Sequence, residues 1–207
     1  ARLDALAEQA RVSVSARGPL VERVEALSAF LFEILGFSGN EDDFYDPRNS
    51  FLDQVLDRRV GIPITLSLVY TEVGTRAGLP LQGVGFPGHF LVKAGQGRGS
   101  LMIDVFSGGR LLTESDLNAR LDAIYGAGAL SVGARPALLR AATNREILVR
   151  MLRNLKSIYL RREETARVLD MVSAILALVP DLPDELRDRG LLYRDLGHIP
   201  AALADLR

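Results

Sequence analysis

The residues best suited to chemistry lie between positions 49 and 106. A helix is expected to begin after Gly61, and His89 and then Asp104 follow it, each in a segment of strand composition. This order is that of a cysteine–histidine–aspartate site, with a nucleophile at the start of a helix, an imidazole as base and a carboxylate that orients the imidazole. A helix N-terminus lowers the pKa of a thiol, and adjacent strands hold imidazole and carboxylate together. We therefore predict that His89 and Asp104 face each other within hydrogen-bonding distance.

The expected thiol is missing, because the chain contains no cysteine. Thr65 and Ser67 lie on the same expected helix, and Ser67 lies one turn, roughly 6 Å, beyond its start. A serine needs a strong base beside it, and nothing in the sequence places Ser67 against His89. One alternative is therefore a hydrolase or amide-bond enzyme that uses Ser67, and the other is that both hydroxyls pack on a buried helix face.

His89 and Asp104 also have an interpretation without catalysis. They can form a structural hydrogen-bonded pair, or a retained pair that binds a ligand. The only other histidine is His198, which falls in a loop between helices. One histidine and one carboxylate are too few ligands for a metal ion, so the sequence predicts no metal site and no cofactor.

Asn49, Arg58 and Arg59 are polar residues beside the predicted site. Asn49 comes just before a helix, where asparagine caps the helix or stabilises a turn. Arg58 and Arg59 end that helix, where cations complement the helix dipole. The functional alternative is that these three residues and Ser67 bind a carboxylate or a phosphate.

The overall composition excludes several classes of function. The 25 lysines and arginines are balanced by 26 acidic residues, so the chain lacks the basic surface that nucleic acid or an anionic membrane requires. No apolar run approaches the roughly 20 residues of a transmembrane helix, and the first residues lack the layout of a secretory signal. We expect a globular protein of the cytoplasm, with neither nucleic acid nor membrane among its partners.

Hydrophobic periodicity predicts the elements that position these residues. Strands are expected at residues 81–85, 90–94 and 101–106, the last two joined by a flexible hairpin connection. Two pairs have the spacing of a capping box at a helix start, Ser50 with Asp53 and Thr113 with Asp116. The expected helices cover residues 20–35, 50–60, 63–76 and 113–126. The fold class is therefore α+β, a small antiparallel sheet with helices around it and a helical segment ahead of it.

The last third of the chain is predicted to be helical throughout. Helices are expected at residues 143–159, 163–178, 183–196 and 199–207, and an offset of 34 residues aligns Leu152 with Leu186 and Tyr159 with Tyr193. This offset is the tetratricopeptide period, and an ordinary pair of helical hairpins is the alternative. Since such arrays usually need about three repeats, we expect these two to pack on the first domain or to continue beyond Arg207. The small residues around 126–136 place the domain boundary between a first domain, 1–130, and the repeats, 131–207.

Residues 20–207 resemble a known family. The matching motifs are YDPRNS at 45–50, RRVGIPI at 58–64, PGHF at 87–90 and ID at 103–104, with RML at 150–152 and RDRGL at 187–191 in the repeats. The central block is similar to the transglutaminase-like core, and the whole chain resembles the bacterial Sir-B-one family, in which such a core precedes tetratricopeptide repeats. The resemblance implies a papain-like transglutaminase fold.

The resemblance also identifies the position of the missing nucleophile. In catalytic transglutaminase-like domains the nucleophile follows a Gly-x step at the helix start, and it lies about fifteen residues before the glycine that ends the helix. Counting forward from Gly61 and back from Gly78 selects Pro63 both times. Proline has no nucleophile, and its fixed φ suits a first helical turn. His89 and Asp104 match the other two positions, so the resemblance implies a relic of a catalytic triad.

The leading hypothesis is a pseudoenzyme, a non-catalytic protein-binding or regulatory module. Its helical repeats would bind an unknown protein or peptide, and its core would offer a remodelled cleft. The enzyme alternative combines His89 and Asp104 with a nucleophile other than cysteine, such as Ser67. A third hypothesis is a structural subunit of a larger complex. The family's link with the regulation of invasion genes is implied by the resemblance alone.

Overall fold

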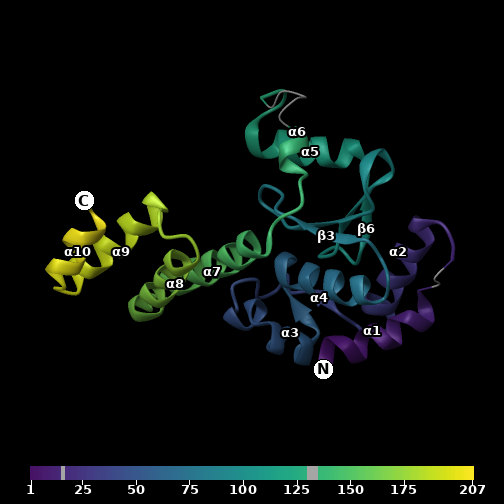
Figure 1. Cartoon of the computed structure of the whole chain (residues 1–207), viewed down its shortest axis with the longest axis horizontal. Coiled ribbons are helices and arrows are strands. Elements are labelled where there is room, and N and C mark those ends of the chain that lie inside the picture. The colour runs from purple at the N-terminus through teal and green to yellow at the C-terminus, as the bar shows by residue number, and fades with distance from the viewer. Residues whose placement is uncertain (15–16, 130–134) are drawn as a thin grey trace. The chain divides into compact units, whose positions relative to one another are not determined.

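The computed structural model describes residues 1–14, 17–129 and 135–207 (Figure 1). The chain forms two compact units, one of residues 1–44 with 48–143 and the other of residues 45–47 with 144–207. The predicted domain boundary between residues 130 and 131 lies outside the described residues and stays a prediction. All candidate site residues belong to the first unit, and the four helices predicted for the repeats belong to the second.

The helix predicted over residues 20–35 changes type along its length. It begins as an α-helix and continues as a π-helical turn, Ala29–Ile34, in which the Leu35 N–H donates to the carbonyl of Phe30, five residues back. Gly36 then takes a left-handed conformation, with φ of 72°. The other α-helices that precede the sheet in the described part of this unit are α1, α3 and α4. The bounds are α1 Arg2–Ser13, α2 Leu20–Ser28, α3 Leu52–Arg58 and α4 Pro63–Arg76.

One of the two capping boxes predicted in the first unit is confirmed. At the start of α5 (Glu114–Tyr125), Thr113 Oγ1 accepts from the Asp116 N–H at 3.1 Å, and an Asp116 carboxylate oxygen accepts from the Thr113 N–H at 2.8 Å. The prediction at Ser50 is wrong, because Ser50 ends a 3-10 turn, Pro47–Ser50, and Phe51 is the N-cap of α3. The buried Ser50 hydroxyl has no hydrogen-bond partner among the described residues.

The sheet has four antiparallel strands in the order β3-β4-β5-β6. Their bounds are β3 Leu81–Val84, β4 Leu91–Ala94, β5 Leu101–Asp104 and β6 Arg110–Leu112. The three predicted strands are confirmed, each somewhat shorter than expected, and β6 was not predicted. A separate parallel pair, β1 (Ser38–Gly39) with β2 (Val60–Gly61), was also missed. This pair joins the chain before the loop 40–49 to the chain before α4.

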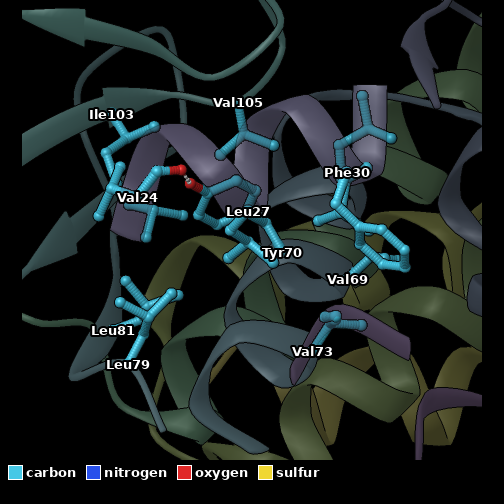
Figure 2. Close-up of a cluster of buried hydrophobic side chains, with 14 of the residues drawn as sticks. Val24, Leu27, Phe30, Val69, Tyr70, Val73, Leu79, Leu81, Ile103 and Val105 are labelled. Carbon is cyan, nitrogen blue, oxygen red and sulfur yellow. Dashed lines mark hydrogen bonds between the residues drawn. The ribbon is translucent and has the colours of Figure 1, made fainter. Parts of the chain in front are cut away.

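Helices cover both faces of the four-stranded sheet. Val92 and Ile103, which are partners in the register of β4 and β5, pack into a core with residues of α2 and α4. Figure 2 shows Ile103 among the side chains of this core. On the opposite face, Leu91 and Met102 pack with Leu117 of α5. This alternation is what a period of two residues predicts for a sheet buried on both sides. The short helix α6 (Arg135–Leu138) contributes Leu138 to the second cluster.

The second unit consists of two consecutive helical hairpins, which confirms the four predicted helices. The bounds are α7 Asn144–Arg161, α8 Thr165–Leu178, α9 Pro183–Asp195 and α10 Ile199–Asp205. Lys156 of α7 contacts Glu185 and Asp188 of α9, each at 2.6 Å, which links the two hairpins. The predicted α+β class is thus confirmed, with an all-α region at its C-terminal side. Among the residues described, none of the helices combines the length and apolar character needed to span a membrane.

Candidate functional site: the His89–Asp104 pair

His89 and Asp104 are brought together by neighbouring strands. Asp104 is the last residue of β5, whereas His89 lies in the turn two residues before β4 rather than within the strand. Nε2 of His89 lies 2.8 Å from Oδ1 of Asp104, so the predicted proximity is confirmed. The Asp104 side chain is only 1% exposed and that of His89 is 18% exposed. The pair is therefore a largely buried hydrogen bond at one end of the sheet.

Asp104 has further partners that the sequence reasoning did not predict. Its Oδ2 accepts from Nη2 of Arg120 at 2.5 Å and from the Ser107 hydroxyl at 3.0 Å. Burial by itself raises the pKa of Asp104, but the hydrogen bonds from His89 and Arg120 outweigh burial and hold the pKa well below its usual range. Asp104 is therefore ionised in the folded protein at any pH near neutrality.

Pro63 is the first residue of α4, as the sequence count predicts for the nucleophile position. The preceding Ile62 is the N-cap, and its N–H donates to Oγ1 of Thr65 at 3.1 Å. The Thr65 hydroxyl in turn donates to the carbonyl of Asn49 at 2.8 Å. The start of α4 is thus held by Thr65, and the residue at the nucleophile position carries no reactive group.

Ser67 lies one turn further along α4 and is 1% exposed. Its hydroxyl donates to the backbone carbonyl of Phe90 at 3.4 Å. Phe90 directly follows His89, so Ser67 lies near the turn that carries the imidazole. However, its hydrogen bond is made to the backbone and not to the imidazole ring. This geometry favours the interpretation of Ser67 as a packed residue of a buried helix face.

Asn49 is completely buried and its side chain is saturated by protein groups. Nδ2 donates to the carbonyls of Asp43 at 2.8 Å and Phe44 at 3.4 Å, while Oδ1 accepts from Asn40 at 3.1 Å and Arg58 at 3.3 Å. These bonds fix the loop that connects β1 to the 3-10 turn. They favour the turn-stabilising role of Asn49 over a role in ligand binding.

The four residues predicted to bind a ligand make hydrogen bonds to protein groups. Arg58 reaches Asn49, whereas the exposed Arg59 donates to the carbonyl of Leu35 at 2.6 Å. Arg59 ends α3 in a left-handed conformation with φ of 57°. The hydrogen bonds of Asn49, Arg59 and Ser67 thus go to three different parts of the unit. A role of these residues in binding a ligand such as a carboxylate or a phosphate stays a prediction.

Aromatic rings flank the histidine. Phe106 lies edge-on to the His89 ring, with centroids 6.1 Å apart, and edge-on to Phe44 at 6.2 Å. Gly39 lies against Phe106, since a Cβ at that position would come within 2.6 Å of the ring. Neither phenylalanine was predicted from the sequence as part of the site, and nor were Arg120 and Ser107. Of these, only Ser107 has a local signal, because an acceptor three residues before it is typical of an Asx-type turn.

The described residues contain no group of three histidine, cysteine, aspartate or glutamate side chains placed to hold a metal ion. The chemistry that the arrangement offers is therefore that of one imidazole hydrogen-bonded to one buried carboxylate. Such a pair can bind a polar group or transfer a proton.

Comparison with known proteins defines the class of this fold and site. Residues 1–153 match the transglutaminase-like superfamily, and residues 155–207 match the tetratricopeptide repeat. No solved structure matches the chain.

Similar proteins are found in bacteria and in animals. A UPF0162 protein of Xylella fastidiosa is 46% identical over 185 residues, which are 89% of this chain and 66% of that protein. A UPF0162 protein of Vibrio cholerae is 35% identical over 184 residues, covering 88% of this chain and 67% of that protein. F-box only protein 21 of Homo sapiens is 32% identical over 188 residues, 86% of this chain but 28% of that protein.

The chain belongs to the transglutaminase-like superfamily and, within it, to the UPF0162 proteins, the Sir-B-one-like family that the sequence motifs resemble. It spans 66% of the length of the Xylella relative.

Proposed function

We propose that this chain is a non-catalytic protein-binding or regulatory module on a transglutaminase-like fold. The observation that carries the proposal is Pro63 at the first position of α4, in a chain without cysteine. Attack on an acyl group requires a nucleophile where the pyrrolidine ring stands. His89 and Asp104 then serve as a hydrogen-bonded pair that holds the turn before β4 against the end of β5.

The second unit supports a binding function. Tetratricopeptide repeats generally mediate protein–protein interaction, and residues 155–207 match that repeat. A block similar to 86% of this chain also occurs within F-box only protein 21, of which it forms 28%. A block that recurs inside a longer protein behaves as a module with its own surface. We propose a protein or peptide as the partner and the cytoplasm as the location.

The enzyme alternative is a hydrolase or amide-bond enzyme that uses a hydroxyl nucleophile. The intact His89–Asp104 hydrogen bond favours it, because this pair is what a base and its orienting carboxylate need. The contact of Ser67 with the Phe90 carbonyl opposes it. We therefore place it second.

Activity assays separate these two proposals. Amine incorporation and peptide hydrolysis are measured for the wild type, His89→Ala, Ser67→Ala and Pro63→Cys. We expect no turnover in the wild type. We also expect none in Pro63→Cys, although its thiol should react with an alkylating reagent, because donors aimed at an oxyanion, worth about 3–4 kcal/mol each, are needed besides the thiol. Wild-type turnover that His89→Ala abolishes would overturn the pseudoenzyme proposal, and its further loss in Ser67→Ala would establish the serine mechanism.

Site-specific crosslinking tests the binding role of the second unit. A photoreactive residue is introduced at Leu160 or Leu203, which are 52% and 49% exposed in the second unit, and at Val12, which is 89% exposed in the first unit and serves as the matched control. We expect specific adducts in cells from the second-unit positions and none from Val12. Adducts from Val12 alone would refute binding through the repeats. Adducts from both units in constant proportion would favour a structural subunit of a complex.

A further inference from the structure

The loop 40–49 is shared between the two units of the chain. Its tip, residues 45–47, belongs to the second unit, whereas the residues on either side of the tip belong to the first. The guanidinium of Arg161, the last residue of α7, lies over the ring of Tyr45, 4.2 Å from the ring centroid. This distance is that of a cation–π contact. The tip of the loop is thus held at the end of α7 within the second unit.

The residue just before the tip contacts the candidate site. Phe44 lies edge-on to Phe106 with ring centroids 6.2 Å apart, and Phe106 lies edge-on to His89 at 6.1 Å. Gly39, directly before the loop, also lies against the Phe106 ring. Because Phe44 and Tyr45 are consecutive, their Cα atoms are about 3.8 Å apart, so a displacement of one displaces the other.

Hydrogen bonds fix the first half of the loop within the first unit. The N–H of Asn40 donates to the carbonyl of Gly61 at 2.9 Å, and the N–H of Asp43 donates to Oδ1 of Asn40 at 3.0 Å. The buried Asn49 accepts from Asn40 and donates to the Asp43 carbonyl. These bonds reach Asp43, two residues before the tip, so their opening reports any loosening of the tip.

We propose that the loop is a conformational link, in which the contact of Tyr45 with Arg161 holds the adjacent Phe44 in place at the candidate site. Its two states are the tip held on α7 and the tip released, and Arg161 is a positioning residue that favours the first. A protein bound at the end of α7 would compete for Arg161 and so change the surroundings of His89 without touching it. That use of the link rests on the proposed function. The link itself is a property of the chain alone, so its failure leaves the proposed binding function standing.

Hydrogen exchange and NMR spectra of the whole chain test the link. Arg161→Ala removes the cation from the ring, so the Asp43 amide should exchange about two- to fivefold faster, which is the change in population that an exposed contact of this kind supports. The ring signals of Phe106 should shift in the same variant. Arg161→Lys also presents a cation to the ring and should restore both readouts.

Arg167→Ala is the matched control, because Arg167 lies over Tyr159 of α7, at 5.1 Å, and not over the loop. It should leave both readouts unchanged. Tyr45→Leu removes the other partner of the contact and should reproduce the changes of Arg161→Ala, so the test does not depend on one variant folding. Unchanged exchange in both variants, or equal changes in the control, would overturn the proposal. Faster exchange with unshifted Phe106 signals would overturn it as well, since the loop would then loosen without affecting the site.

Discussion

Replacing Asn49 with alanine should destabilise the first unit, because one buried amide holds the loop 40–49. The substitution removes the donor to the Asp43 and Phe44 carbonyls and the acceptor of Asn40 and Arg58. The two shorter bonds, at 2.8 and 3.1 Å, contribute about 1 kcal/mol each, and partner groups left unpaired cost about 1 kcal/mol or more. The free energy of unfolding should therefore fall by about 2–4 kcal/mol.

Thermal denaturation followed by circular dichroism measures this loss. At about 2–4 °C per kcal/mol for a chain of this size, the Tm of the first unit should fall by about 5–15 °C. Gln96→Ala is the matched control, since it removes an exposed carboxamide from the loop between β4 and β5 and should change stability by less than about 0.5 kcal/mol. If Asn49→Ala kept the wild-type Tm but lost partner binding, Asn49 would be a binding residue and the structural reasoning would be refuted.

Three further predictions concern the core and the site. Gly109→Ala should lower the free energy of unfolding by about 2–4 kcal/mol, because Gly109 has φ of 82° and a Cβ there would overlap the Ser28 side chain. Denaturant unfolding measures this loss, and an unchanged denaturation midpoint would contradict it. Tyr70→Phe should cost about 1–2 kcal/mol, measured in the same way, since the buried hydroxyl donates to the Val24 carbonyl at 3.1 Å. The pKa of Asp104 is lower in the folded state, so the ionised carboxylate stabilises the fold fully above about pH 5, and this stabilisation is lost as the pH falls. The Tm of the wild type should therefore exceed that of Asp104→Asn by less at acidic pH than at neutral pH. A difference in Tm that stays constant with pH would contradict this.

Elements with a long or repeated pattern were predictable from the sequence. α4 has Pro63 at its start and an apolar stripe, α5 has a complete capping box, and the helices of the second unit repeat at a fixed offset. The strands β1, β2 and β6 have two, two and three residues, too few to show alternation. The prediction of a capping box at Ser50 was wrong because the spacing of Ser50 and Asp53 does not determine the backbone conformation, and the chain there forms a 3-10 turn.

The candidate site was predictable only where the sheet sets its geometry. His89 and Asp104 lie close together because they adjoin neighbouring antiparallel strands that sequence patterns identify. Arg120 lies on α5, 16 residues after Asp104, and no rule of sequence spacing predicts a contact between these two residues. For Asn49, the residue type allows both capping and ligand binding. Its complete burial favours the first, and burial is a property of the tertiary structure.

The π-helical turn Ala29–Ile34 has a consequence for how chains of this family can change length. Its hydrogen bonds reach five residues back, so the turn holds one residue more than an α-helical turn. Phe32 is fixed by stacking on Tyr70, with ring centroids 6.1 Å apart, whereas Glu33 and Ile34 are exposed. Deletion of Glu33 would let the turn close as an ordinary α-helix while the flanking segments keep their places. Single-residue insertions and deletions should therefore be tolerated here more readily than in the neighbouring α2 or β1.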